Sequence, residues 1–309
     1  MVRRIEGEGT EEEAAQGKGG LSMGVKVRER KGTYRILIVG LLTLLISTSL
    51  VVTAFGGQFE DAVAAHKRGD YATAYRLFKP LAEQGNTDAQ NNLGVMYDKG
   101  QGVPKDFSEA AKWYRKAAEQ GEAMAQYNLG VMYDYGRGVP QDYTEAVKWY
   151  RKAAKQGMLQ AQYNLGLNYL DGRGVPQDYA EAVKWFRKAA EHGIPKAQYN
   201  LGFMYLYGRG ISQNYTEAGK WYRRAAEQGL PEAQVNLGMM YYNGQGVPQD
   251  YILAHMWLNL AASQYPASEK EKRKDAMDNR DFAVSKMAPA QIAEAQRLAR
   301  EWKPKKEGR

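Results

Sequence analysis

A Leu-Gly pair recurs along this chain at a constant interval of 36 residues. Each leucine has an alanine four positions before it and a tyrosine four positions after it. At about 100° per residue, these three positions fall within about 80° of one another on a helix. The chain is therefore expected to be an array of similar helical units, each with one buried stripe. The pairs are Leu93-Gly94, Leu129-Gly130, Leu165-Gly166, Leu201-Gly202 and Leu237-Gly238.

A second helix is expected in each unit, beginning after an acid or amide that is followed three residues later by glutamate. That spacing is typical of a capping box. The pairs are Asp106 and Glu109, Asp142 and Glu145, Asp178 and Glu181, and Asn214 and Glu217. The helix is expected to end at a left-handed glycine, namely Gly121, Gly157, Gly193 or Gly229. Its small alanines allow close approach, which explains a glycine inside each first helix despite a cost of about 1 kcal/mol.

The complete motif reads Ala-x-x-x-Leu-Gly-x-x-Tyr, Gly-x-Gly-Val, Asp, and Ala-x-x-Trp-Tyr-x-x-Ala-Ala-x-x-Gly. It resembles the Sel-one-like repeat (SLR) family, a relative of the tetratricopeptide repeats. Residues 89–229 hold four full copies, and a fifth copy begins at Ala233. The resemblance implies an all-α, right-handed α-solenoid of helix-turn-helix repeats that binds other proteins.

Both ends of the array depart from the motif. The first unit lacks the Leu-Gly pair, and the fifth copy has Leu253 in place of glutamate. Beyond it, a capping box at Ser268 and a proline at Pro289 are expected to open two capping helices, because a stack must cover its last apolar face. The expected division is a basic segment without a structural pattern over 1–35, an apolar segment over 36–54, a degenerate first repeat over 58–88, five repeats with the last incomplete over 89–262, and capping helices with a basic tail over 263–309.

The apolar segment over residues 36–54 carries no charge and follows a cluster of basic residues that ends at Arg35. This pattern indicates export. The segment is either a signal peptide cut after Ala54 or a retained anchor, since it is about long enough to cross a ~30 Å hydrocarbon core. Either alternative places the repeats outside the cytoplasm, in the periplasm or on the outer side of the cytoplasmic membrane. Both Met1 and Met23 are possible starts.

The net charge of +8 comes mostly from the two ends of the chain, because residues 36–262 carry only +2. So weak a field argues against nucleic acid as a partner. Contact with a membrane is expected only through residues 36–54, if they remain uncleaved. The basic residues of the second helices, such as Lys112, Arg115 and Lys116, alternate with glutamates and are expected to form a solvated face.

Nothing in the sequence indicates catalysis, a metal or a cofactor. Cysteine is absent, and the three histidines His66, His192 and His255 lie in different units without a recurrent acid beside them. No Gly-x-Ser-x-Gly motif occurs. The glycine-rich turns such as residues 100–104 follow predicted helices, whereas a phosphate-binding loop follows a strand.

The side of each first helix opposite the buried stripe is the predicted ligand-binding surface, and by resemblance it lines a concave groove. It carries an asparagine column and a tyrosine column. Two interpretations are open for the asparagines: their amides pair with a ligand's peptide groups, or they tie neighbouring helices together. The apolar members of this side are expected mainly to pack against the next unit. The candidates are Asn92, Asn128, Asn164, Asn200, Asn236, Tyr127, Tyr163 and Tyr199.

The sequence therefore predicts a non-enzymatic, exported scaffold that binds a protein or peptide through its repeats. The alternative is a protein that binds cell-wall glycan, in which tyrosine and tryptophan rings would stack on sugar faces.

Overall fold

The structure is a computed structural model that describes residues 57–305, and every regular element within that range is an α-helix. The chain divides into two units, one up to Ala54 and one from Phe55, and the described residues belong to the second. The predictions for residues 1–35 and 36–54 lie outside the described range. Across residues 57–305, no helix combines the length and the apolarity needed to cross a bilayer.

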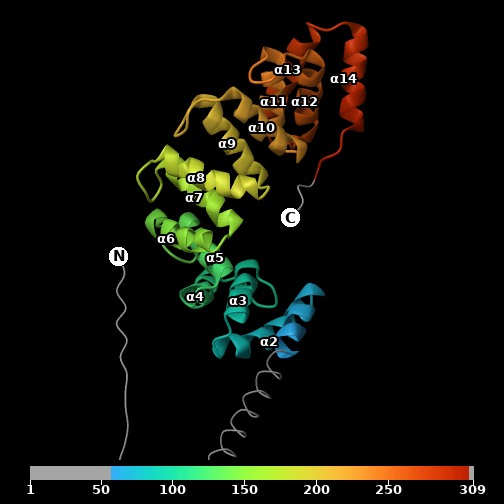
Figure 1. Ribbon diagram of the computed structural model, residues 1–309. Helices are drawn as coiled ribbons and strands as arrows, with labels where there is room; N and C mark the ends of the chain where they lie inside the picture. The colour runs from blue at the N-terminus through green and yellow to red at the C-terminus, as the bar shows by residue number, and fades with distance from the viewer. Residues whose placement is uncertain (1–56, 306–309) are drawn as a thin grey trace, which may run out of the picture. The chain divides into compact units, whose positions relative to one another are not determined.

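The predicted helix pairs are present and follow one another along the array (Figure 1). The first helices are α3 (Thr87–Lys99), α5 (Ala123–Tyr135), α7 (Leu159–Asp171), α9 (Pro195–Tyr207) and α11 (Pro231–Asn243). The second helices are α4 (Phe107–Glu119), α6 (Tyr143–Lys155), α8 (Tyr179–Glu191), α10 (Tyr215–Glu227) and α12 (Tyr251–Gln264). Helical residues 57–67 and α2 (Tyr71–Glu83) precede them, and α13 (Lys270–Val284) and α14 (Pro289–Glu301) follow.

Each helix packs mainly against the helices next to it in sequence, so the core is a series of small clusters rather than one centre. The glycine of each first helix lies against the second helix of its unit, as the sequence predicted. The contact is a buried aromatic ring in α3, α5, α7 and α9, and it is Leu258 in α11. At Gly130, an added Cβ would lie 2.7 Å from both Cδ1 and Cε1 of Tyr150. Glycine is therefore required where the two helices meet.

The caps of the second helices match the prediction only in part. Asp106 accepts hydrogen bonds from the backbone N–H groups of Ser108 and Glu109, at 2.8 and 3.0 Å. The Glu109 carboxylate does not return this bond, so the predicted capping box is wrong. The N–H of Asp106 already donates to the Tyr97 carbonyl at 3.0 Å, and Glu109 instead accepts from Lys112 at 2.6 Å. The same arrangement recurs in α6, α8 and α10.

The last two helices cover the end of the array. Helix α14 begins at Pro289 as predicted, and its Gln291 side chain accepts from the N–H of Ala288 at 2.8 Å. The capping box predicted at Ser268 is wrong, because α13 begins after Glu269 without a side-chain cap. Helix α12 contacts both α13 and α14, and the rings of Trp257 and Trp302 meet edge to face with centroids 6.1 Å apart.

Candidate functional site

The predicted asparagine column lies on one side of the first helices, here called the first-helix face. At its first positions the amides are used within the protein. Asn92 Nδ2 donates to the carbonyl of Asp88 at 2.8 Å, one turn back in its own helix. Asn128 Nδ2 donates to Asn91 Oδ1 at 3.0 Å and so joins α5 to α3. The Asn128 contact favours the interpretation that the asparagines tie neighbouring helices together, whereas the Asn92 contact stays within one helix.

The predicted tyrosine column is half-buried beside the same asparagines. Tyr127, Tyr163 and Tyr199 pack on aromatic rings of their own second helices, with centroids 5.9, 6.0 and 5.7 Å apart. Burial raises the pKa of all three phenols, and an asparagine amide of the next unit opposes that rise in each case. The phenols therefore stay neutral at physiological pH and offer hydroxyl groups and ring edges.

The apolar residues of the first-helix face pack against the following unit, as predicted. Val95 packs with the core that contains Leu129, and Leu167 packs with the core that contains Leu201. Tyr127 and Tyr163 take part in the same inter-unit packing. Much of this surface therefore stabilises the stack, and only part of it is open to a ligand.

One depression on the first-helix face brings several predicted residues together. It lies where α7, α9 and α11 adjoin and has a volume of about 200 Å³. The predicted residues that line it are Tyr163, Tyr199 and Asn200, and they are joined there by Lys196, Leu230 and Glu232. The other candidates, Asn92, Asn128, Asn164, Asn236 and Tyr127, do not line it.

The two charges of this depression differ in their environment. Glu232 forms an ion pair with Lys272 of α13 at 3.5 Å, and Lys272 also pairs with Glu269 at 2.7 Å. Lys196 is exposed, and no carboxylate within residues 57–305 pairs with it. The depression thus combines two rings, one amide and one cation that is available to an anionic group.

Sequence reasoning missed Lys196, Leu230 and Glu232 because they lie outside the repeated motif. The position of Lys196 in α9 is occupied by Asp88 in α3, Met124 in α5 and Gln160 in α7. A position that changes its chemistry from unit to unit gives no periodic signal. The depression is therefore a property of one place in the array rather than of the repeat.

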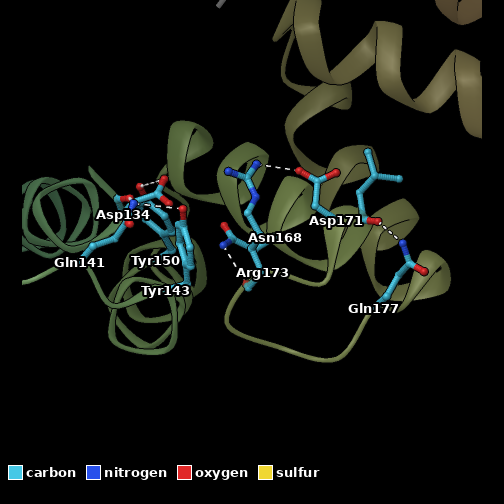
Figure 2. Close-up of polar contacts among 9 residues, drawn as sticks. Asp134, Gln141, Tyr143, Tyr150, Asn168, Asp171, Arg173 and Gln177 are labelled. Atoms are coloured by element: carbon cyan, nitrogen blue, oxygen red, sulfur yellow. Dashed lines mark hydrogen bonds and ion pairs between the residues drawn. The ribbon is translucent and has the colours of Figure 1, made fainter. Parts of the chain in front are cut away.

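The loop edge of the middle units is occupied by internal contacts (Figure 2). Arg173 pairs with Asp171 at 2.6 Å, and the hydroxyl of Tyr150 donates to Asp134 at 3.2 Å. Gln141 and Gln177 each donate to the last turn of the preceding first helix at 2.8 Å. These polar groups fix the turns between helices and are not arranged around a shared opening.

The basic face of the second helices is likewise accounted for by structural contacts. Arg115 donates to the Tyr133 hydroxyl at 2.7 Å, and the same pairing of arginine and tyrosine recurs in α6, α8 and α10. The ammonium of Lys116 lies 4.1 Å from the ring centroid of Trp113. The predicted charge compensation is present, since the exposed Lys112 pairs with Glu109 and the same pair recurs in α6, α8 and α10. The arginines in addition link the second helices to the following first helices.

A column of buried glutamines was not predicted, although the Ala-Gln dipeptide that marks it recurs in every full unit. Each amide donates to a carbonyl at the end of the preceding second helix, at 3.0–3.2 Å. In three units the side-chain oxygen accepts from a glutamine 30 residues later, at 2.8 Å. In the unit of Gln162 that later position is His192, and the Gln162 oxygen has no partner.

Replacing His192 by glutamine is therefore expected to stabilise the protein by about 0.5–1.5 kcal/mol, the net value of one hydrogen bond. The new amide would satisfy a buried acceptor that is satisfied at Gln90, Gln126 and Gln198, though not at Gln234. Urea unfolding checks this, with His192→Ala as the control that removes the ring without adding an amide. A midpoint for His192→Gln no higher than that of His192→Ala would contradict the assignment.

The three histidines lie apart in the structure. His66 bonds to Gln101 Oε1 at 3.1 Å, His192 is exposed at the end of α8, and His255 is buried in α12. Burial and nearby Arg280 lower the pKa of His255, so it is neutral at pH 7. Within residues 57–305, no three His, Asp or Glu side chains are grouped as a metal site would require.

Comparison with known structures places the chain among Sel1 repeat proteins. A Sel1 repeat protein from Oxalobacter formigenes is 38% identical to this chain and superposes on it with a TM-score of 0.65. The alignment covers 68% of this chain and 86% of the Oxalobacter formigenes chain. A protective antigen with an SLR fold from uropathogenic Escherichia coli is 31% identical over 80% of this chain and 68% of that chain, with a TM-score of 0.38. No curated protein sequence matches the chain.

The family model of the Sel1 repeat matches six consecutive segments, including the first one that lacks the Leu-Gly pair. They are residues 64–86, 87–122, 123–158, 159–194, 195–230 and 231–265. Together with the helix pairs, the interval of 36 residues and the solved relative, these matches show that the chain belongs to the Sel1 repeat family.

Proposed function

We propose that this protein is an exported, non-catalytic scaffold that binds a protein or peptide on its first-helix face. Sel1 repeats commonly serve as scaffolds for protein interactions. The observation that carries the proposal is the depression between α7, α9 and α11, where Tyr163, Tyr199 and Asn200 meet Lys196.

The chemistry of the depression suits a peptide. Tyrosine rings provide apolar contact area with little side-chain entropy to lose. The Asn200 amide can both donate to and accept from a peptide group. Lys196 can pair with a carboxylate of the ligand. The phenols, with raised pKa, cannot act as bases near neutral pH, so binding rather than proton transfer is the expected role.

The test is capture from an envelope extract with purified wild type and single variants, quantified by mass spectrometry. Lys196→Gln and Asn200→Ala are expected to reduce recovery of a specific protein at least about fivefold, whereas the matched control Asn92→Ala retains it. Asn92 is the equivalent position in α3 and bonds only within its own helix. Circular dichroism verifies that each variant is folded.

Full recovery of every partner with folded Asn200→Ala and Lys196→Gln would refute the first-helix site. In a parallel arm, purified cell-wall fragments replace the extract. Binding to the fragments without capture of any protein would support the glycan-binding alternative instead.

Export is part of the proposal and has its own test. Cell fractionation with N-terminal sequencing is expected to find the protein in the envelope. A soluble form beginning at Phe55 would identify residues 36–54 as a cleaved signal, and a membrane-bound form that retains them would identify an anchor. Recovery of the full chain in the cytoplasm alone would refute export.

A further inference from the structure

The second helix of one unit departs from its copies at a buried position. Helix α10 has Gly219 where α4, α6 and α8 have Ala111, Val147 and Val183, which are all buried. The close approach that explains the other helical glycines does not apply here. An added Cβ would come no closer than 3.3 Å to any atom, and the two atoms at that distance are methyl ends of Met240 and Val247.

A glycine in this helix costs about 1 kcal/mol relative to alanine, and packing does not require it. Gly219 lines an open depression of about 440 Å³ between α10 and the turn before α12. We call this depression the Gly219 pocket. Gly219, Val247 and Pro248 form its apolar part, and Thr216, Lys220 and Arg223 lie at its polar part.

A depression on the surface of α6 has a different lining. The depression there is smaller, about 280 Å³, and it is lined by Trp149 and charged side chains rather than by the following turn. Val147 of α6 is 1% exposed and does not line it. An apolar floor is therefore present beside Gly219 and absent from the depression on α6.

The charges at the Gly219 pocket are all positive. Lys220, Arg223 and Arg224 line it, and no acidic residue does, although Lys220 pairs with Glu217, outside the lining, at 2.6 Å and so shares its donors with that carboxylate. Arg223 donates to the hydroxyl of Tyr241, and its guanidinium lies 5.7 Å from the ring centroid of Tyr241. This contact holds the guanidinium in place and uses only part of its five N–H donors. A cation held in this way loses little entropy when it binds a carboxylate.

We propose that the Gly219 pocket is a second docking site, which binds an acidic segment of a partner protein. An aliphatic side chain of that segment lies over Gly219, and a neighbouring carboxylate pairs with Lys220 and Arg223. Charge complementarity selects an acidic ligand, and the apolar floor selects an aliphatic residue within it. An anionic membrane is disfavoured as the ligand of this pocket, because it would bind the more basic surface of α6 in preference. That surface carries Lys148, Arg151, Lys152 and Lys155 but lacks the apolar floor.

The decisive variant is Gly219→Val, because the fold already contains this arrangement. In the preceding unit the equivalent residue, Val183, is buried. Met204 and Ile211 of that unit are the equivalents of Met240 and Val247. Valine at position 219 is therefore expected to fold, to fill the floor and to leave the thermal unfolding midpoint equal to or above that of the wild type.

The probe is a set of fluorescent synthetic peptides that alternate glutamate or aspartate with leucine, with lysine-leucine and acidic glycine-rich peptides as controls. Anisotropy with the full chain is expected to show binding of the acidic aliphatic peptides only. Gly219→Val should weaken it at least about tenfold, since it excludes a buried aliphatic group. Lys220→Gln should weaken it severalfold, and the matched Lys184→Gln in α8 should leave it unchanged.

Several outcomes would overturn the proposal. These are equal affinity of the wild type and folded Gly219→Val, equal losses for Lys220→Gln and Lys184→Gln, or no binding of any acidic aliphatic peptide. Binding of vesicles with anionic lipids that Gly219→Val abolishes, in the absence of peptide binding, would assign the pocket to a membrane instead. Asn200→Ala should not affect the peptides, so this test is independent of the first-helix site.

Discussion

Gly138→Ala is expected to destabilise the protein by about 2–5 kcal/mol, through two effects that act together. The first is the backbone conformation, since Gly138 has a φ of +68°, which disfavours any residue with a Cβ. The second is contact with the preceding unit. An alanine Cβ would lie 2.1 Å from the Phe107 carbonyl oxygen and 2.6 Å from the Ser108 nitrogen, and these backbone atoms cannot move without displacing the start of α4.

The matched control is Gly121→Ala, which separates the two effects. Gly121 has a φ of +98°, but an added Cβ there would meet nothing within 4 Å. This variant should therefore lose only the conformational part, about 1–2 kcal/mol. Urea unfolding followed by circular dichroism measures both. If Gly138→Ala costs no more than Gly121→Ala, the close contact between the turn and the preceding unit is not as described.

Gly166→Ala is expected to cost about 1–3 kcal/mol, although alanine in the middle of a helix normally stabilises it by about 1 kcal/mol relative to glycine. The sign is reversed because the new Cβ would lie 2.6 Å from Cδ1 and Cε1 of Phe186. The Phe186 ring is fully buried and packs against Tyr163, so it has no space into which to turn.

A double-mutant cycle with Phe186→Ala isolates this contact. Removing the ring should cost several kcal/mol by itself, but in that background Gly166→Ala should become neutral or stabilising. The free energy of unfolding of the four proteins gives the coupling. A stabilising effect of Gly166→Ala in the wild-type background would show that the two helices are not in contact at this glycine.

The helix pairs could be predicted because their signals repeat. The Leu-Gly pair and the alanines of the second helix recur at helical spacing in the five units from α3 to α12, and the contact of Gly130 with Tyr150 confirms why the glycine is there. The capping box failed because its missing bond depends on a partner outside the local sequence. The N–H of Asp106 is taken by the carbonyl of Tyr97, in the helix before the turn. Local spacing carries no information about that contact.

The candidate site was predictable only as a surface. Whether Asn128 faces a ligand or its neighbour Asn91 depends on the distance between adjacent first helices, which the repeat interval does not specify. The place where the surface opens depends on Lys196 and Glu232, which do not repeat. The buried glutamines could have been found from the Ala-Gln dipeptide, since a polar residue that recurs beside a buried alanine requires a buried partner.

The interrupted glutamine column also has a mechanical consequence. In an array held together by contacts between neighbours, a strained or stretched molecule opens first at its weakest joint. The oxygen of Gln162, like that of Gln234, has no partner, so the joint between the start of α7 and the end of α8 has one fewer internal link than the joints at Gln90, Gln126 and Gln198. The depression lined by Tyr163 borders this joint. We therefore expect the array to open more readily at this joint, next to the place where a ligand would enter, than at the joints whose glutamines are paired.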